Sequence, residues 1–125
     1  MKVAELMATN LKTMSTDSTL ADAIVDLAEA QVSALPVIDR YGRAVGVLST
    51  REVLKAESER VAPGTRVLEI MAPWPTTIDP DIDVRQAAQD MLYLNVQRLF
   101  VEYDGSLVGV ISQTDIVGAV ATAKV

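Results

Sequence analysis

The feature that most limits the fold of this chain is an internal repeat. The string VAELMA at residues 3–8 returns 64 residues later as VLEIMA at residues 67–72. The same offset pairs Asp26 with Asp90 and Val37 with Val101. One residue is then lost at a turn, the offset becomes 63, and residues 42–49 match residues 105–112. Matches in one register with a single gap indicate two copies of one structural unit.

The two copies set the predicted domain organisation. Pro63 and Gly64 lie between them and mark a linker, because both residues interrupt regular structure. We therefore predict a first repeat over residues 1–56, a linker over 57–66 and a second repeat over 67–125.

Each repeat predicts the same order of elements. Apolar residues spaced i, i+3, i+4, i+7 and i+8 indicate an amphipathic helix in each copy: Leu20, Ala23, Ile24, Leu27 and Ala28, then Val84, Ala87, Ala88, Met91 and Leu92. Two short apolar runs follow in each copy and predict strands over 34–38, 44–48, 98–103 and 107–111. The Asp104-Gly105 pair between two such runs is typical of a hairpin. A short first strand is predicted near residues 13–14 and 77–78, and a second helix from Ser49 and from Ser112.

These elements predict an α+β fold built from two β-α-β-β-α repeats. A single repeat of roughly 55 residues is marginal alone, so we expect the two to pack sheet to sheet about a pseudo-two-fold axis. Asp17 or Ser18, and Asp81, are the predicted caps of the first helix in each copy. Because the helical stripes are rich in small residues, we also expect a homodimer.

Composition removes several functional classes. The chain has no cysteine and no histidine, which excludes zinc-thiolate sites, cysteine nucleophiles and Ser-His-Asp chemistry. Its formal charge of −6 disfavours binding to nucleic acid, which needs clustered Lys and Arg. We find no signal peptide and no apolar stretch of about 20 residues, so the sequence predicts a cytoplasmic protein without a membrane span.

Two sets of motifs carry a family resemblance. The first copy reads VSALPVID at residues 32–39 and GVLSTRE at 46–52; the second reads VQRLFV at 96–101 and GVISQTD at 109–115. In this order and twice over, they resemble a tandem pair of cystathionine β-synthase (CBS) domains, also called a Bateman module. The resemblance covers about residues 3–121.

The resemblance implies a regulatory module rather than an enzyme. Members of this family bind adenosine compounds (AMP, ADP, ATP or S-adenosylmethionine) in clefts between the two repeats. A carboxylate can accept hydrogen bonds from both hydroxyls of a ribose, and hydroxyls at a helix N-terminus suit a phosphate. No cofactor or metal is expected to be intrinsic, although a nucleotide can bring Mg²⁺ with it.

Carried over by position, the resemblance implies a main nucleotide site around Asp115. Asp115 would bind the ribose, Ser112 and Thr114 would lie near the phosphate, and Val110 would pack on the base. The first repeat would supply the opposite wall, with Lys12 reaching a phosphate: Asn10, Leu11, Lys12, Thr13, Val32, Ser33 and Ala34.

A second, weaker site is implied around Glu52. Glutamate stands there in place of the family's usual aspartate, so its longer side chain would need a shifted sugar or backbone. Two arginines near this cleft would favour a di- or triphosphate. The residues implied for this site are Glu52, Ser49, Arg51, Val47, Thr76, Val96, Gln97 and Arg98.

The motifs also have a purely structural interpretation. Ser112 with Asp115, and Ser49 with Glu52, have the spacing of capping boxes, in which the hydroxyl caps the helix and the acid reaches back to the cap N–H. This interpretation leaves open a ligand-free dimerisation scaffold. A small enzyme is disfavoured, and an adenine nucleotide sensor that acts on a separate effector protein is the main hypothesis.

Overall fold

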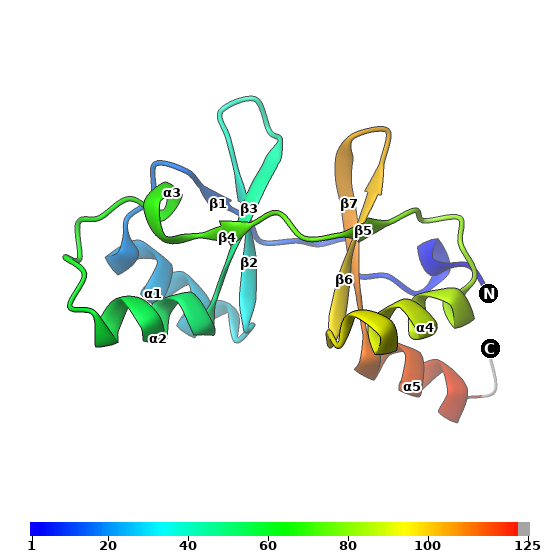
Figure 1. Ribbon diagram of the computed structural model, residues 1–125. Coiled ribbons are helices and arrows are strands. Elements are labelled where there is room, and N and C mark those ends of the chain that lie inside the picture. Colours follow the sequence, from blue (N-terminus) through cyan, green and yellow to red (C-terminus); the bar gives the residue numbers. More distant parts are fainter. Residues whose placement is uncertain (123–125) are drawn as a thin grey trace. The chain divides into compact units, whose positions relative to one another are not determined.

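The computed structural model describes residues 1–122 and divides into two compact units. Unit 2 runs over Lys12–Pro75, whereas unit 1 joins Met1–Leu11 to the chain from Thr76 onward. Each unit holds one sheet and two of the longer helices (Figure 1). The predicted α+β class with two repeats of helices and strands is confirmed.

The elements follow the predicted order within each unit. Unit 2 contains β1 (Met14–Ser15), α1 (Leu20–Ala30), β2 (Ala34–Ile38), β3 (Ala44–Ser49), α2 (Thr50–Ser58), α3 (Val67–Ile70) and β4 (Ala72–Pro73). Unit 1 contains η1 (Val3–Glu5), β5 (Thr77–Ile78), α4 (Val84–Leu94), β6 (Arg98–Tyr103), β7 (Ser106–Ser112) and α5 (Gln113–Ala121). Helix α2 therefore continues into the segment predicted as a linker.

The sheet of unit 2 has the strand order β1-β2-β3-β4. Strand β1 is parallel to β2, with Met14 opposite Val37, and β2 forms an antiparallel hairpin with β3. The apolar side of α1 packs on this sheet, where Leu27 joins buried residues of β2 and β3 in one core. Those core residues are Met14, Ala23, Leu27, Leu35, Val37, Leu48 and Val67.

The sheet of unit 1 repeats this arrangement in the order β5-β6-β7. Ala8 pairs with Val110 at the edge of β7, as Ala72 pairs with Val47 at the edge of β3. The core of unit 1 contains Val3, Ile78, Ala87, Met91, Leu99, Val101 and Ile111. The two units thus have equivalent sheets, and one short segment completes the edge of each.

The segments before the first strand of each repeat are exchanged between the units. We call residues 1–11 and 65–75 the exchanged segments. Val3 is fully buried in the core of unit 1, and Val67 is fully buried in the core of unit 2. Their backbone N–H groups donate to Ile82 O (2.9 Å) and Ser18 O (2.7 Å), respectively. Each compact core is therefore built from parts of both sequence repeats.

Two glycines permit the close approach of these segments. A Cβ on Gly109 would lie 2.6 Å from Met7 Sδ, and one on Gly46 would lie 2.5 Å from Met71 Sδ. Atoms this close would overlap, so any larger residue would push the segment away from the sheet.

The predicted caps of α1 and α4 were wrong by a short step along the chain. Thr19 caps α1 and Asp83 caps α4, whereas the prediction named Asp17 or Ser18, and Asp81. The earlier residues form the turn before each helix instead: Asp17 N donates to Ser15 Oγ, and Asp81 N donates to Asp79 Oδ1.

The predicted helical stripes are only partly buried. In α1, Leu20, Ala23 and Leu27 are buried, but Ile24 remains 42% exposed. The exposed edge of the stripe faces a groove of about 320 Å³ whose lining includes Ile24, Ala28 and Leu54. The sequence pattern could not separate side chains that face the sheet from those that face this groove.

Candidate functional site

The turn from β7 to α5 fixes a carboxylate beside a helix N-terminus. Ser112 caps α5: its Oγ accepts a hydrogen bond from Asp115 N (3.1 Å), and Asp115 Oδ2 accepts one from Ser112 N (2.9 Å). Both residues are partly buried. Within residues 1–122, Asp115 Oδ1 accepts no hydrogen bond, so this oxygen is available to a ligand.

An exchanged segment pairs with β7 just before this turn. Ala8 N donates to Val110 O (2.8 Å), and Val110 N donates to Ala8 O (3.0 Å). This pairing brings the stretch with Asn10 and Leu11 into the unit that holds Asp115. Unit 1 thus contains these residues predicted for the main site: Asn10, Leu11, Val110, Ser112, Thr114 and Asp115.

The other residues predicted for the main site belong to unit 2: Lys12, Thr13, Val32, Ser33 and Ala34. Within that unit, Ser33 O accepts from Thr50 N (2.9 Å), and Ala34 pairs with Ser49. Ser33 and Ala34 therefore border the turn of their own repeat.

Lys12 has an internal partner. Its Nζ lies 3.8 Å from Asp26 Oδ1, and both side chains are partly exposed. An exposed pair of this kind contributes little to stability, so Lys12 can exchange the carboxylate for another anion at small cost.

The turn from β3 to α2 repeats this geometry with a glutamate. Glu52 Oε1 accepts hydrogen bonds from Ser49 N (2.7 Å) and from Ser49 Oγ (2.6 Å). The longer side chain therefore folds back onto the cap and engages the hydroxyl as well as the backbone. Unit 2 holds Val47, Ser49, Arg51 and Glu52 of the second predicted site, and unit 1 holds Thr76, Val96, Gln97 and Arg98.

The start of β6 borders the Asp115 turn in the same way. Gln97 O accepts from Gln113 N (2.9 Å), Val96 O accepts from Gln113 Nε2 (3.2 Å), and Arg98 pairs with Ser112. Both capping boxes expected from the sequence are present. Capping does not exclude ligand binding, because within residues 1–122 only one carboxylate oxygen of each acid accepts a hydrogen bond.

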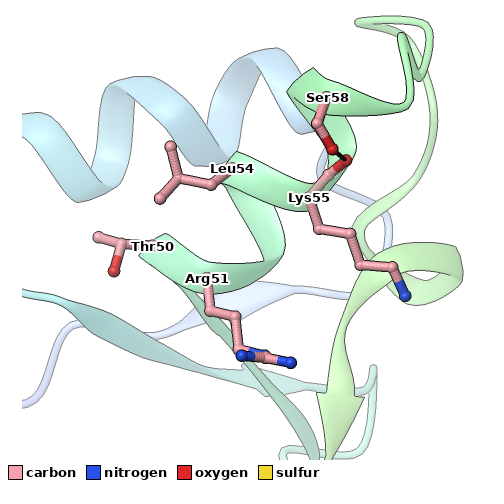
Figure 2. Close-up of a pocket in the computed structure, with 5 residues that line it drawn as sticks. All are labelled: Thr50, Arg51, Leu54, Lys55 and Ser58. Carbon is pink, nitrogen blue, oxygen red and sulfur yellow. Dashed lines mark hydrogen bonds between the residues drawn. The ribbon is translucent and has the colours of Figure 1, made fainter.

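Cationic side chains lie on the exposed side of α2. A hollow of about 630 Å³ is lined by Thr50, Arg51, Leu54, Lys55 and Ser58. Figure 2 shows Arg51 and Lys55 on one side of the helix and Leu54 on the other. Within residues 1–122, neither cation forms an ion pair. They add positive potential near the Glu52 turn, which suits a phosphate group.

The sequence analysis did not predict the segments that pair with β7 and β3, the strands that lead into the two turns. Ala8 and Ala72 pair with β7 and β3, and Met7 and Met71 lie against the glycines of the motifs. The signal was present, because the Met-Ala pair occurs at the same place in both repeats. The repeated Met-Ala pair does not by itself indicate that Met and Ala of one repeat lie beside a strand of the other repeat.

Residues 1–122 show neither a cluster of metal ligands nor a membrane-spanning helix. Among residues 1–122, no group of three or more Asp or Glu side chains is arranged to hold a metal ion. No helix in that part of the chain is long and apolar enough to cross a bilayer.

Comparisons with known proteins show what the chain is similar to. Curated relatives include an uncharacterized 17.7 kDa protein of Acidianus ambivalens (28% identical, 94% of this chain and 72% of that protein). They also include an A-adding tRNA nucleotidyltransferase of Aquifex aeolicus (28% identical) and an inosine-5'-monophosphate dehydrogenase of Methanocaldococcus jannaschii (28% identical). The chain matches them over 96% and 92% of its own length but spans only 14% and 23% of theirs.

Solved structures share the fold closely. The crystal structure of CBSX2 in complex with AMP superposes with a TM-score of 0.86 at 28% identity, over 99% of this chain and 98% of that one. A protein of Vibrio cholerae described as a putative acetoin utilization protein gives a TM-score of 0.87 at 27% identity, over 98% and 92%. The CBS domain model matches this chain at residues 3–59 and 67–122. The chain therefore belongs to the CBS domain family, and it contains two such domains in tandem.

Proposed function

We propose that this chain is a regulatory module that binds an adenosine nucleotide, with Asp115 as the ribose-binding residue. The observation that carries the proposal is the geometry of the β7–α5 turn. Its carboxylate is fixed by the cap through Oδ2 while Oδ1 is available, and the helix N-terminus lies beside it. The complex of CBSX2, a relative of 28% identity, with AMP supports an adenosine nucleotide as the class of ligand.

The chemistry of the turn suits each part of such a ligand. A fixed carboxylate can accept hydrogen bonds from vicinal hydroxyls, which strengthens binding because the acceptor is charged. The Ser112 and Thr114 hydroxyls and the helix dipole favour a phosphate. Val110 offers an apolar side chain for the base. Mg²⁺ would enter only with a polyphosphate.

The Glu52 turn is proposed as a weaker second site. Glu52 Oε1 accepts two hydrogen bonds from Ser49, whereas Asp115 Oδ2 accepts one from Ser112, so the Glu52 side chain is held more firmly toward its cap and is less free to adjust to a ribose. Arg51 and Lys55 would favour a ligand with more than one phosphate at this turn.

Calorimetric titration with AMP, ADP, ATP and S-adenosylmethionine tests the proposal. Asp115→Asn keeps an oxygen that can accept from the cap N–H but removes the charge. We expect it to weaken the tightest ligand roughly tenfold to hundredfold, as a charged hydrogen bond is worth about 1.5–3 kcal/mol. The matched variant Glu52→Gln should change that affinity much less. Equal losses from both variants would contradict the ranking of the two turns.

A second candidate function, a ligand-free scaffold, is favoured by a different observation. The groove between α1 and α2 has a counterpart of about 270 Å³ between α4 and α5, lined by Ala88, Met91, Leu92, Gln113, Ile116 and Val117. Leu54 and Val117, at equivalent positions, are 69% and 66% exposed. Apolar grooves repeated in both units suit a homodimer formed through these helices.

Sedimentation velocity of the wild type and of a double variant, Leu54→Glu with Val117→Glu, tests whether this dimer forms. We expect a dimer for the wild type and a monomer for the variant, because both substitutions place charge in an apolar contact. Dimerisation without heat or thermal shift from any of the four ligands would favour the scaffold over the sensor. A separate effector protein and a cytoplasmic location complete the proposal; isolation of the native complex and cell fractionation test them.

A further inference from the structure

Arg98 is a cation beside the strand that leads into the Asp115 turn. It begins β6, where it pairs with Ser112, the cap of α5. Gln113 N donates to Gln97 O, so Arg98 and Ser112 are a pair whose own backbone groups do not bond each other. The Cα atoms of such a pair are about 4.5 Å apart, and the two side chains lie on the same face of the sheet. The Arg98 side chain therefore begins next to the capping hydroxyl.

The face of the sheet that carries Arg98 also carries two residues of the proposed site. Leu99 and Ile111, the next pair along the hairpin, belong to the buried core of unit 1. Because side chains alternate along a strand, Arg98 and Ser112 point to the opposite face. Val110 lies on that face as well, two residues before Ser112. Arg98 thus shares one face with the residues proposed to contact the base and the phosphate.

Within residues 1–122, the guanidinium of Arg98 has no anionic partner. The side chain is half-buried, yet it forms no ion pair and no hydrogen bond in this part of the chain. The other cations of unit 1 in this range are placed elsewhere: Lys2 Nζ donates to Asp81 O (2.9 Å), and Arg85 is the second residue of α4. Partial burial of a cation without a partner costs hydration energy, which an anion from outside the chain would offset.

The equivalent position of unit 2 holds no charge. Ala34 stands 64 residues before Arg98 and pairs with Ser49, the cap of α2, in the same register. The hairpin and the cap therefore form with alanine at this position, so the fold does not require the arginine. An arginine beside one turn and an alanine beside the other indicate a role in ligand binding at the Asp115 turn.

We propose that Arg98 binds the phosphate of the nucleotide held by Asp115 and makes this site selective for ligands with a phosphate. This assignment rests on the proposed function and narrows its ligand class. A guanidinium can donate two parallel hydrogen bonds to a phosphate, and the Ser112 hydroxyl beside it is already proposed to lie near that group. S-adenosylmethionine has a sulfonium in place of the phosphate, and a guanidinium repels it. AMP, ADP and ATP are therefore favoured over S-adenosylmethionine and over adenosine.

Calorimetric titration of Arg98→Ala with AMP and with adenosine tests the assignment. Alanine occupies the equivalent position of unit 2, so the hairpin tolerates it. We expect AMP to bind about ten- to hundredfold more weakly than it binds the wild type, the range for one charged hydrogen bond. The affinity for adenosine, titrated directly or by displacement of AMP, should be unchanged because adenosine has no phosphate. If Arg98→Ala does not fold, Arg98→Gln takes its place with the same expected results.

Three further variants separate the phosphate contact from other effects. Asp115→Asn should weaken AMP and adenosine alike, because both contain the ribose. Arg98→Lys keeps the charge but not the paired donors, so it should retain part of the preference for AMP. Arg85→Ala removes the same charge from an exposed position on α4 and should leave both affinities unchanged.

The possible results distinguish the role of Arg98 from the proposed function. Equal losses for AMP and adenosine in Arg98→Ala, no loss for AMP, or tighter binding of S-adenosylmethionine than of AMP to the wild type overturns the role of Arg98 while the site stands. No binding of AMP, ADP, ATP or S-adenosylmethionine to the wild type overturns both.

Salt dependence gives a second measurement. Raising the salt from about 0.05 M to about 0.5 M should weaken AMP binding to the wild type more than AMP binding to Arg98→Ala, because salt screens the contact between the guanidinium and the phosphate. Equal salt dependence in the two proteins overturns the contact.

Discussion

At the scale of single residues, Ser112 and Asp115 combine a structural role with a proposed binding role, and substitution can separate the two. Ser112→Ala removes the acceptor for Asp115 N, so we expect the free energy of unfolding to fall by about 1 kcal/mol. Thr114→Ala is the matched control, because that hydroxyl makes no hydrogen bond within residues 1–122. Urea denaturation measures the free energy of unfolding of both variants. Equal losses would contradict a stabilising role of Ser112 as the helix cap.

A second prediction at this scale concerns pH. Hydrogen bonds from the backbone and side chain of Thr19 lower the pKa of Asp22, and one from Arg85 N lowers the pKa of Asp83. A lowered pKa in the folded state stabilises the fold above the ordinary value of 3.8, and this contribution is lost as pH falls through 3.8 and below. Asp22→Asn should therefore lose less stability than the wild type between about pH 6 and about pH 3. If the urea midpoints of the two proteins fall by the same amount over this pH range, the expectation is contradicted.

At the scale of elements, the motif glycines hold the exchanged segments against the sheets. Gly46→Ala would place a methyl group 2.7 Å from Ala72 O, and the backbone there has little room to move. We expect a loss of about 1–3 kcal/mol, the usual cost of overpacking. Gly109→Ala should cost less, because the carbonyl of Ala8 lies farther away, at 3.0 Å.

Gly118→Ala serves as the control for both substitutions. Nothing lies within 4 Å of its Cβ position, and it lies inside α5, so alanine should add about 0.5–1 kcal/mol to stability. Thermal unfolding of the three variants measures the order. A stability of Gly46→Ala equal to that of Gly118→Ala would show that the segment is not held closely.

At the scale of the whole molecule, the exchange predicts which half of the chain folds alone. Residues 12–75 form one compact unit and include Val67, which is fully buried in the core of that unit. Residues 1–64 have the same length and match the sequence repeat, but they lack Val67. We expect the 12–75 fragment to show the cooperative thermal transition and the 1–64 fragment to show a weaker one or none. Circular dichroism measures this difference, and the reverse order would contradict the exchange.

Much of the fold was predictable from the sequence, because the repeat and the hydrophobic periods are local signals. The runs that became β2 and β6 were predicted with their observed bounds, and Ser49 and Ser112 were predicted to start the second helices. The same reasoning placed the caps at Asp17 or Ser18, and at Asp81. It failed there because acidic and hydroxyl residues shape turns as well as helix starts.

The amino-acid sequence alone predicts the two repeats, the order of their elements, the hairpin turns and the pairing of each serine with its acid. These follow from spacing and side-chain chemistry within a few residues. The sequence alone does not predict that Val3 enters the core of the second repeat and Val67 that of the first, or that Lys12 pairs with Asp26; these contacts are seen in the folded chain. Two repeats with the same order of elements offer equivalent places for the same apolar residue, so local patterns cannot choose between them. The choice depends on the path of the chain and on packing between residues far apart in the sequence.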